Sequence, residues 1–198
     1  MKPGGQKAKG SAYERKVAEL FTKHYYSDGD GEFRRVPMSG AWDKKVAPGD
    51  IIPLKRSYGE SYTFDEQFPF SIECKNHSDI KHFFSGLYSA ESDIWLWMEQ
   101  SSYDASFAKK IPIVVFKLYR TFDVVFLKKE HIRRLEDLFG ELKDRYYIIG
   151  RCNITDDEAA SATGMVFLLF KDFLEWIDWG HFKVQRFIRS YKTVGDDE

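Results

Sequence analysis

An aspartate and a Glu-x-Lys triplet are the residues of this sequence whose types and spacing best suit chemistry. Asp50 lies near the start of one predicted strand, and Glu73, Cys74 and Lys75 lie on the next. Because side chains alternate along a strand, Glu73 and Lys75 share one face, with the Cys74 carbonyl between them. If the two strands are neighbours, Asp50 and Glu73 converge and offer the oxygen ligands that Mg²⁺ prefers. Lys75 could then activate a water or stabilise charge on a phosphate, so the set suits metal-assisted phosphodiester hydrolysis.

Two of these assignments have simpler alternatives. Glu73 and Lys75 could be an ordinary surface ion pair in an unrelated α/β protein, where such a pair contributes about 0–1 kcal/mol. Glu14 lies beside the apolar stripe of the first predicted helix and could be a further metal ligand. It also stands three residues after Ser11, which is the spacing of a capping box at a helix N-terminus. The residues alone leave both alternatives open.

The elements that must position these residues follow from the periodicity of the apolar side chains. Helical periodicity covers residues 11–26 and 92–109. Strands are predicted at 33–38, 49–54, 69–75, 112–118 and 124–127, and residues 55–67 read as a polar connection. This order of helix, three strands, helix and further strands predicts an α/β fold with a mixed central β-sheet flanked by helices.

The two ends of the chain differ from this central part. Residues 1–10 are predicted to be a flexible basic arm because three glycines lie among three lysines. Residues 11–127 form the expected core domain. Residues 128–198 form a C-terminal α+β extension packed on it, with a helix at 129–142, a strand at 146–152, an acidic loop at 155–158 and an apolar run from 165. A last helix carries a basic face, formed by Lys183, Arg186, Arg189 and Lys192.

Composition excludes several classes of protein. With 43% hydrophobic and 31% charged residues, the 198-residue chain is predicted to be globular rather than disordered. Its apolar runs are far shorter than the roughly 18–20 residues of a membrane span. Two cysteines cannot build a disulfide framework or a thiolate zinc site. The N-terminus has no apolar stretch of a secretory signal, so the expected location is the cytoplasm.

The charge is unevenly distributed. Residues 1–60 hold 12 Lys and Arg against 8 Asp and Glu, although the whole chain has a net charge of −1. A basic N-terminal third permits contact with a polyanion, and ordinary surface charge is the alternative. Arg34, Arg35, Lys44 and Lys45 flank the predicted site and are candidates for contacts with a DNA backbone.

The ordered motifs resemble those of the PD-(D/E)xK nuclease superfamily. The segments PGDI and FSIECKN supply Asp50, Glu73 and Lys75 at the family's positions. KGSAYERKVAELF and RRVPMSG resemble the first helix and following strand of archaeal-type Holliday-junction resolvases. WLWMEQSSYDASFAKKIPIVVFK resembles a later helix and strand of phage-type relatives. The resemblance covers about residues 9–117. The sequence lacks the family's Pro-Asp dipeptide, because Gly49 stands between Pro48 and Asp50.

The resemblance implies a role for each matched residue. It implies a restriction-endonuclease-like αβββαβ core in which Asp50, Glu73 and the Cys74 carbonyl hold Mg²⁺, for which Mn²⁺ can substitute. Glu14 would be a further ligand, and Lys75 and Gln100 would act on the water or the phosphate. DNA contacts would come from the matched residues near this site together with the basic pairs, namely Lys9, Arg15, Arg34, Arg35, Ser39, Lys44, Lys45 and His77. His77 and Ser39 could equally be a solvated loop residue and part of an ordinary turn.

The expected function is that of a Mg²⁺-dependent DNA endonuclease, selective for branched DNA such as a four-way junction. A homodimer is expected, because symmetric cutting of two strands needs two sites related by a twofold axis. The setting implied is a prokaryotic or phage-infected host cell, with no membrane partner. The alternatives are a linear-duplex nuclease of restriction or recombination type, and a module of the same fold that binds nucleic acid without cutting it.

Overall fold

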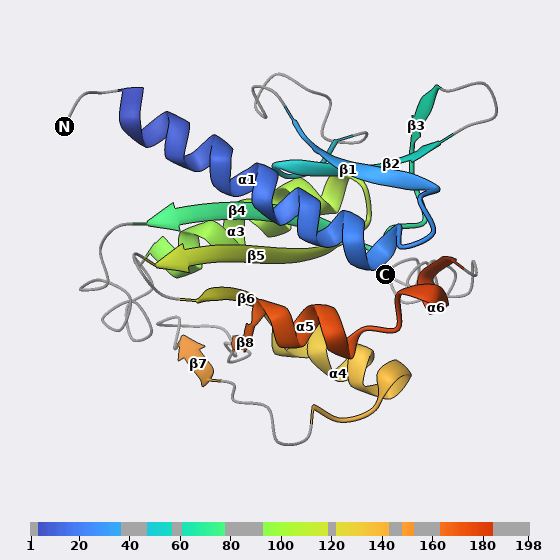
Figure 1. Ribbon diagram of the computed structural model, residues 1–198. Helices are drawn as coiled ribbons and strands as arrows, with labels where there is room; N and C mark the ends of the chain where they lie inside the picture. Colours follow the sequence, from blue (N-terminus) through green and yellow to red (C-terminus); the bar gives the residue numbers. More distant parts are fainter. Residues whose placement is uncertain are drawn as a thin grey trace.

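The structure of the chain is a computed structural model that describes residues 4–36, 47–56, 61–77, 93–118, 122–142, 148–152 and 163–183. An eight-stranded sheet with helices against it forms the molecule (Figure 1). Seven strands follow the order β1-β2-β4-β5-β6-β8-β7, and β3 pairs with β2 outside this path. The prediction of an α/β fold with a mixed sheet flanked by helices is confirmed.

The strands and helices have the following bounds. The strands are β1 (Gly31–Arg35), β2 (Ile51–Arg56), β3 (Tyr62–Phe64), β4 (Phe70–His77), β5 (Ile111–Leu118), β6 (Asp123–Lys128), β7 (Ile148–Cys152) and β8 (Thr163–Leu169). The helices are α1 (Gly4–Tyr25), α3 (Asp93–Phe107), α4 (Lys129–Phe139), α5 (Phe170–Trp176) and α6 (Trp179–Lys183).

The centre of the sheet is the parallel pair β4 and β5, which the chain connects through α3. Two parallel strands need such a crossover connection. Because both faces of the sheet are covered at β5, nearly all side chains of this strand are apolar. The remaining strand pairings are antiparallel, including β2 with β4. The pairing of β2 with β4 confirms that the strand after Asp50 and the strand of Glu73 are neighbours.

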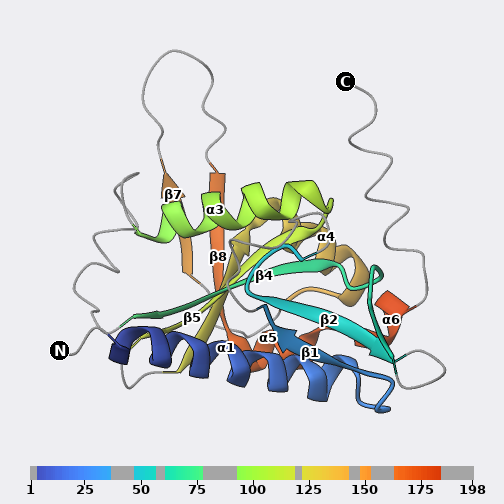
Figure 2. The same cartoon turned by 90° about the horizontal axis from the view of Figure 1, so that it is seen from above.

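Two apolar layers fix the helices to opposite faces of the sheet, with α1 and α3 on either side of β4 and β5 (Figure 2). The main core joins the sheet to α1, α4, α5 and α6, and it is rich in aromatic side chains such as Phe21, Phe68 and Trp179. The second layer packs Ile94 and Met98 of α3 against β5, β6 and β8. Because both faces of the sheet are buried at its centre, polar side chains are few there. Glu73 and Lys75 on β4 are therefore candidates for a functional role.

Alternation along β4 is as the sequence predicts. Phe68, Phe70, Ile72 and Cys74 all belong to the main core beneath α1. The intervening Glu73 therefore points to the face on which α3 packs. The main core also contains Trp179, with Trp176 packed against it, while Trp95 and Trp97 pack against the second layer. These indoles therefore serve packing.

The N-terminal helix begins earlier than predicted. Because α1 starts at Gly4, residues 4–10 are helical instead of continuing a flexible arm, and Ser11 lies inside the helix rather than at its cap. The capping-box alternative for Glu14 is therefore wrong. A tertiary contact accompanies the extension: the Asn76 side-chain amide donates to the Lys9 carbonyl at 3.4 Å, which ties the early turns of α1 to the end of β4. Such contacts override the weak helix propensity of a glycine-containing segment.

Further differences concern the short strands and the C-terminal part. Strand β3 lies within the predicted polar connection, and β1 starts two residues before the predicted 33–38. Strands β7 and β8 lie in the expected extension 128–198, and β8 pairs with β6 in the same sheet. The acidic loop and most of the basic helix fall outside the described residues. Within the described part of the chain, no helix is long and apolar enough to cross a membrane.

Candidate active site

Asp50 is fastened to β4 at the level of the Glu-x-Lys triplet. Its amide donates to the Ile72 carbonyl, and its Oδ2 accepts from the Cys74 amide, both at 2.8 Å. The preceding Gly49 makes this approach possible, because its φ is +86° and a Cβ there would lie 2.4 Å from the Ile72 oxygen. Strand order and a glycine together bring the Asp50 carboxylate to the Cys74 amide, in the peptide bond that follows Glu73.

Glu73 and Lys75 form a part-buried ion pair on the face covered by α3. The Lys75 Nζ donates to the Glu73 Oε1 at 2.6 Å, and the Glu73 residue is only 3% exposed. The same Nζ also donates to the Gln100 Oε1 on α3 at 3.2 Å. The structure therefore brings together Glu73, Lys75 and Gln100 from two elements, as the sequence analysis expects.

The charge balance of this site is unfavourable for an ionised Glu73. Burial, and next the Asp50 carboxylate, raise the pKa of Glu73 to about 7, against the opposing effect of the Lys75 ammonium. Asp104, a residue of α3 that is 7% exposed, adds to the rise in the Glu73 pKa. Burial likewise raises the pKa of the Cys74 thiol, so Cys74 is a neutral thiol at neutral pH. A cation beside Asp50 and Glu73 would relieve their repulsion.

Asp104 is the residue that the sequence analysis missed. It follows Gln100 by one helical turn on α3, so both reach the same region of the sheet. Burial of an aspartate on a helix otherwise packed on an apolar layer is uncommon without partners. The signal available in the sequence was the four-residue spacing from Gln100.

The donor set fits a magnesium ion better than a softer metal. Among the described residues, no group of three or more His, Cys, Asp or Glu side chains is arranged to hold a metal. Two carboxylates, from Asp50 and Glu73, and the Cys74 main-chain carbonyl remain as oxygen donors. This set suits Mg²⁺, which takes one or two carboxylates and keeps several waters.

Glu14 has a partner on the other side of the sheet. Its carboxylate accepts from the Arg35 Nε in an ion pair between α1 and β1. Helix α1 packs on the face to which Cys74 points, and the Glu14 carboxylate adds to the rise in the pKa of the Cys74 thiol. The role of Glu14 as a metal ligand stays a prediction. The ion pair instead joins Glu14, which was predicted to bind metal, to Arg35, which was predicted to contact DNA.

The predicted DNA-contacting residues divide between two places. Arg15 and Arg35 line an open groove of about 580 Å³ between α1 and β1, together with Lys23 and the edge residue Arg34. Lys9 is exposed near the end of β4. Ser39, Lys44, Lys45 and the side chain of His77 lie outside the described residues, so their assignment stays a prediction.

The comparisons with known proteins give one match. The model of a family described as "phage putative PDDEXK endonuclease" matches residues 5–183 of the chain. No curated protein and no solved structure matches it. The matched range runs through both the core and most of the expected extension, so it includes the site and all the described strands and helices except the first residue of α1.

Proposed function

The chain belongs to the phage putative PDDEXK endonuclease family, and from this premise we propose that it hydrolyses DNA phosphodiester bonds with Mg²⁺ and selects branched DNA. The observation that carries the proposal is the attachment of Asp50 to β4 beside the Glu73–Lys75 pair. These three side chains are the pattern after which the superfamily is named, and they meet at the junction of β2 and β4.

Each residue has a separate task in this proposal. Asp50, Glu73 and the Cys74 carbonyl would hold Mg²⁺, for which Mn²⁺ can substitute. The ion would supply electrostatic stabilisation of the phosphate charge that builds up during the reaction. Lys75 holds a positive charge beside the scissile phosphate and orients the attacking water, and Gln100 positions the Lys75 ammonium. Water attacks phosphorus in line, the opposite P–O bond breaks, and a proton passes to the departing oxygen.

The preference for branched DNA and the homodimer rest on the motifs of the N-terminal half. The motifs of the N-terminal half resemble those of junction-resolving enzymes, which cut two strands symmetrically. A twofold dimer would supply the two sites that such paired cutting requires. A linear-duplex nuclease and a non-cleaving DNA-binding module remain the competing functions, and the experiment below separates them.

The test is a cleavage assay on a labelled four-way junction and on linear duplexes built from the same strands. Wild-type protein and Asp50→Ala are each incubated with Mg²⁺, with Mn²⁺ and with a chelator. We expect paired cuts near the branch point, only with metal and only with wild-type protein. Equal cutting of junction and duplex would retain the nuclease and reject the branch selectivity. Binding of the junction without cutting in either metal would support the binding module instead.

A further inference from the structure

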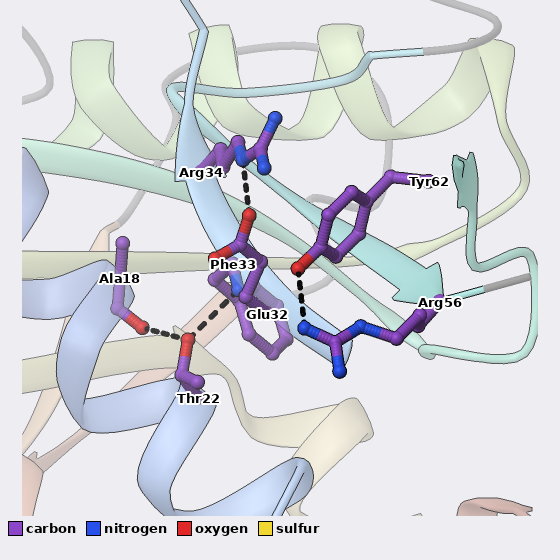
Figure 3. A network of polar contacts seen from close by, with 7 residues as sticks. All are labelled: Ala18, Thr22, Glu32, Phe33, Arg34, Arg56 and Tyr62. Atoms are coloured by element: carbon purple, nitrogen blue, oxygen red, sulfur yellow. Dashed lines mark hydrogen bonds and ion pairs between the residues drawn. The ribbon is translucent and has the colours of Figure 1, made fainter. Parts of the chain in front are cut away.

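Two arginines and a tyrosine form an ordered cluster on strands β1, β2 and β3, which we call the Arg34–Tyr62–Arg56 cluster (Figure 3). The guanidinium carbon of Arg34 lies 4.5 Å from the centroid of the Tyr62 ring, and that of Arg56 lies 5.8 Å from it. Arg56 also donates from Nη2 to the Tyr62 hydroxyl at 3.4 Å. One aromatic side chain therefore holds two positive charges close together.

The cluster lies on the same face of the sheet as Glu73 and Lys75. Ile51 and Ile72 are opposite each other in the β2–β4 pairing, and both pack into the main core beneath α1. Side chains one residue further along each strand therefore point to the other face. That face carries Glu73 on β4. Along β1, β2 and β3 and the residues that flank β1 and β2, it carries a small apolar cluster, formed by Val36, Ala47, Ile52, Leu54 and Phe64.

The arginines and the tyrosine continue this small apolar cluster. Arg34 is two residues from Val36, Arg56 is two from Leu54, and Tyr62 is two from Phe64, so each shares the face of its neighbour. Tyr62 and Arg56 are also directly opposite each other in the β2–β3 pairing. Helix α3 packs on β4 and β5, next to this part of the sheet. The cluster thus lies on a surface beside the candidate active site.

The distance to the active site follows from the geometry of β2. Asp50 immediately precedes Ile51, and Arg56 is the last residue of the strand. Six residues at roughly 3.3 Å per residue place the backbone of Arg56 about 20 Å from that of Asp50. The same length corresponds to about six base-pair steps of roughly 3.4 Å along a duplex. A duplex with one phosphate at Asp50 and Glu73 would therefore reach the cluster slightly more than half a helical turn away.

Exposure suits these arginines to a phosphate. The Arg34 side chain is 53% exposed, and Arg56 is also exposed. The Arg34 Nε donates to the Glu32 carboxylate (Figure 3). Guanidinium groups bind phosphate oxygens in a bidentate manner, and a ring that fixes their plane reduces the freedom lost on binding. The backbone of DNA is the polyanion that would lie along this face.

We propose that the Arg34–Tyr62–Arg56 cluster binds the sugar–phosphate backbone of the DNA that flanks the cut, within about six base pairs of it. This rests on the proposed function for the identity of the substrate. Contacts with the backbone position a duplex without reading its sequence. The cluster would therefore set the affinity and the register of the DNA, and it would leave the choice of sequence unaffected.

The test measures binding without metal, so that cleavage does not enter. Fluorescence anisotropy with a labelled 30-base-pair duplex and a four-way junction gives the dissociation constant at several salt concentrations. The variants are Arg34→Gln with Arg56→Gln, and Tyr62→Leu, which keeps the charges but removes the ring. Lys55→Gln is the matched control. It removes one positive charge from the exposed residue next to Arg56 on β2, whose side chain points to the other face.

We expect the double arginine variant to bind both DNAs about 10- to 100-fold more weakly at moderate salt, because two phosphate contacts are lost. The slope of log affinity against log salt should fall by about 1.8, since each contact contributes roughly 0.9. Tyr62→Leu should weaken binding less and reduce the slope only in part. Lys55→Gln should change affinity less than threefold. Thermal melts of each variant establish that it is folded.

Three results would overturn the proposal. A slope unchanged in the double variant, or a control with the same loss as the double variant, would show that the cluster makes no specific backbone contact. Absence of DNA binding by the wild-type protein would reject both this cluster and the proposed function. Wild-type protein that binds but does not cut, with binding that depends on the arginines, would support the cluster while rejecting the proposed hydrolysis.

Discussion

Burial is what gives the Glu73–Lys75 pair its potential for chemistry, because it strengthens the electrostatic interactions of both side chains. The carboxylate is almost fully buried, and Asp50 is held beside it through the Cys74 amide. On an exposed strand the same Glu-x-Lys would be a surface pair of little consequence. Here the low-dielectric surroundings strengthen both the attraction to Lys75 and the repulsion from Asp50. The site is therefore short of one positive charge, which a divalent cation would supply.

The first prediction concerns the pH dependence of stability without metal. The pKa of Glu73 is about 7 in the folded protein and is lower in the unfolded chain, near the ordinary value of 4.5. Between these values the folded state binds more protons, so this contribution to stability is complete below about pH 4.5 and lost as pH rises through 7. Glu73→Gln should therefore be more stable than wild type at pH 8 by roughly 1–3 kcal/mol, and equal to it near pH 4.5.

The measurement is the melting temperature of both proteins in a chelating buffer from pH 4.5 to pH 8.5. The exposed Glu99→Gln on α3 serves as the control and should follow wild type at every pH. Addition of Mg²⁺ should raise the melting temperature of wild type at pH 8 and have little effect on Glu73→Gln. A difference between Glu73→Gln and wild type that is the same at both ends of the pH range would contradict the pKa assignment.

At the scale of residues, the sequence was enough to identify most of the site residues, but it did not predict all the side chains that they contact. Asp50, Glu73 and Lys75 follow from strand alternation and spacing, and the structure brings them together as expected. The partner of Glu14 did not follow from the sequence: its carboxylate accepts from the Arg35 Nε, and its role as a metal ligand stays a prediction. Asp104 was missed because its four-residue spacing from Gln100 indicates a site only once Gln100 is known to contact Lys75.

At the scale of elements, Gly49 controls how β2 meets β4. Its positive φ lets the chain bridge to Ile72 and still deliver the Asp50 side chain to the Cys74 amide. The departure from the family's Pro-Asp dipeptide thus has a physical reason in this chain. A residue with a Cβ at position 49 would contact the β4 backbone, which cannot move away without disrupting the sheet.

The second prediction is that Gly49→Ala lowers both stability and cleavage. The positive φ costs roughly 1–2 kcal/mol for a residue with a Cβ. The contact with the Ile72 oxygen should bring the total to at least about 3 kcal/mol. Gly29→Ala is the matched control, because its φ is +78° with no atom within 4 Å of a Cβ. We expect the control to lose only the smaller amount and to keep its activity, as measured by denaturant unfolding and cleavage.

Equal stability losses in the two glycine variants would contradict this account of position 49. The glycine itself was visible in the sequence, but its conformation was not, because nothing local indicated that β4 would approach it. The same limit applies to β3, a three-residue strand with one partially buried face and too little alternation to be recognised. The long strands β4 and β5 were recognised because their patterns extend over eight residues.

At the scale of the whole molecule, the C-terminal part shares the core of the nuclease. Trp179 of α6 is 7% exposed and packs against Phe21 of α1 and Phe68 before β4, with ring centroids 5.8 Å and 6.4 Å away. Its indole also donates to the Leu174 carbonyl at 2.8 Å. Residues far apart in the sequence thus stabilise one aromatic layer behind the strand that carries Glu73. The sequence pattern that places a boundary at residue 127 does not predict this shared layer, because its contacts join residues that are far apart in the chain.

The third prediction is that Trp179→Ala destabilises the entire protein by about 3–5 kcal/mol, the usual cost of truncating a large buried aromatic residue. Because the layer includes both α1 and α6, unfolding should stay a single transition. Circular dichroism in the far and near ultraviolet should then give coincident melting curves. Two separate transitions, with only the later one near the wild-type temperature, would show that the C-terminal part is an independent unit. Trp176→Ala, in which a partly buried indole is removed, should cost less.

The most direct measurement of the central claim is single-turnover cleavage of labelled DNA by Glu73→Gln in Mg²⁺. This change keeps the shape of the side chain but removes its negative charge, and Asp137→Asn on the exposed surface of α4 is the control. We predict that Glu73→Gln cleaves at least about 10²-fold more slowly than wild type while its affinity for DNA is retained, and that the control cleaves normally. Cleavage at the wild-type rate by Glu73→Gln would contradict the assignment of the active site.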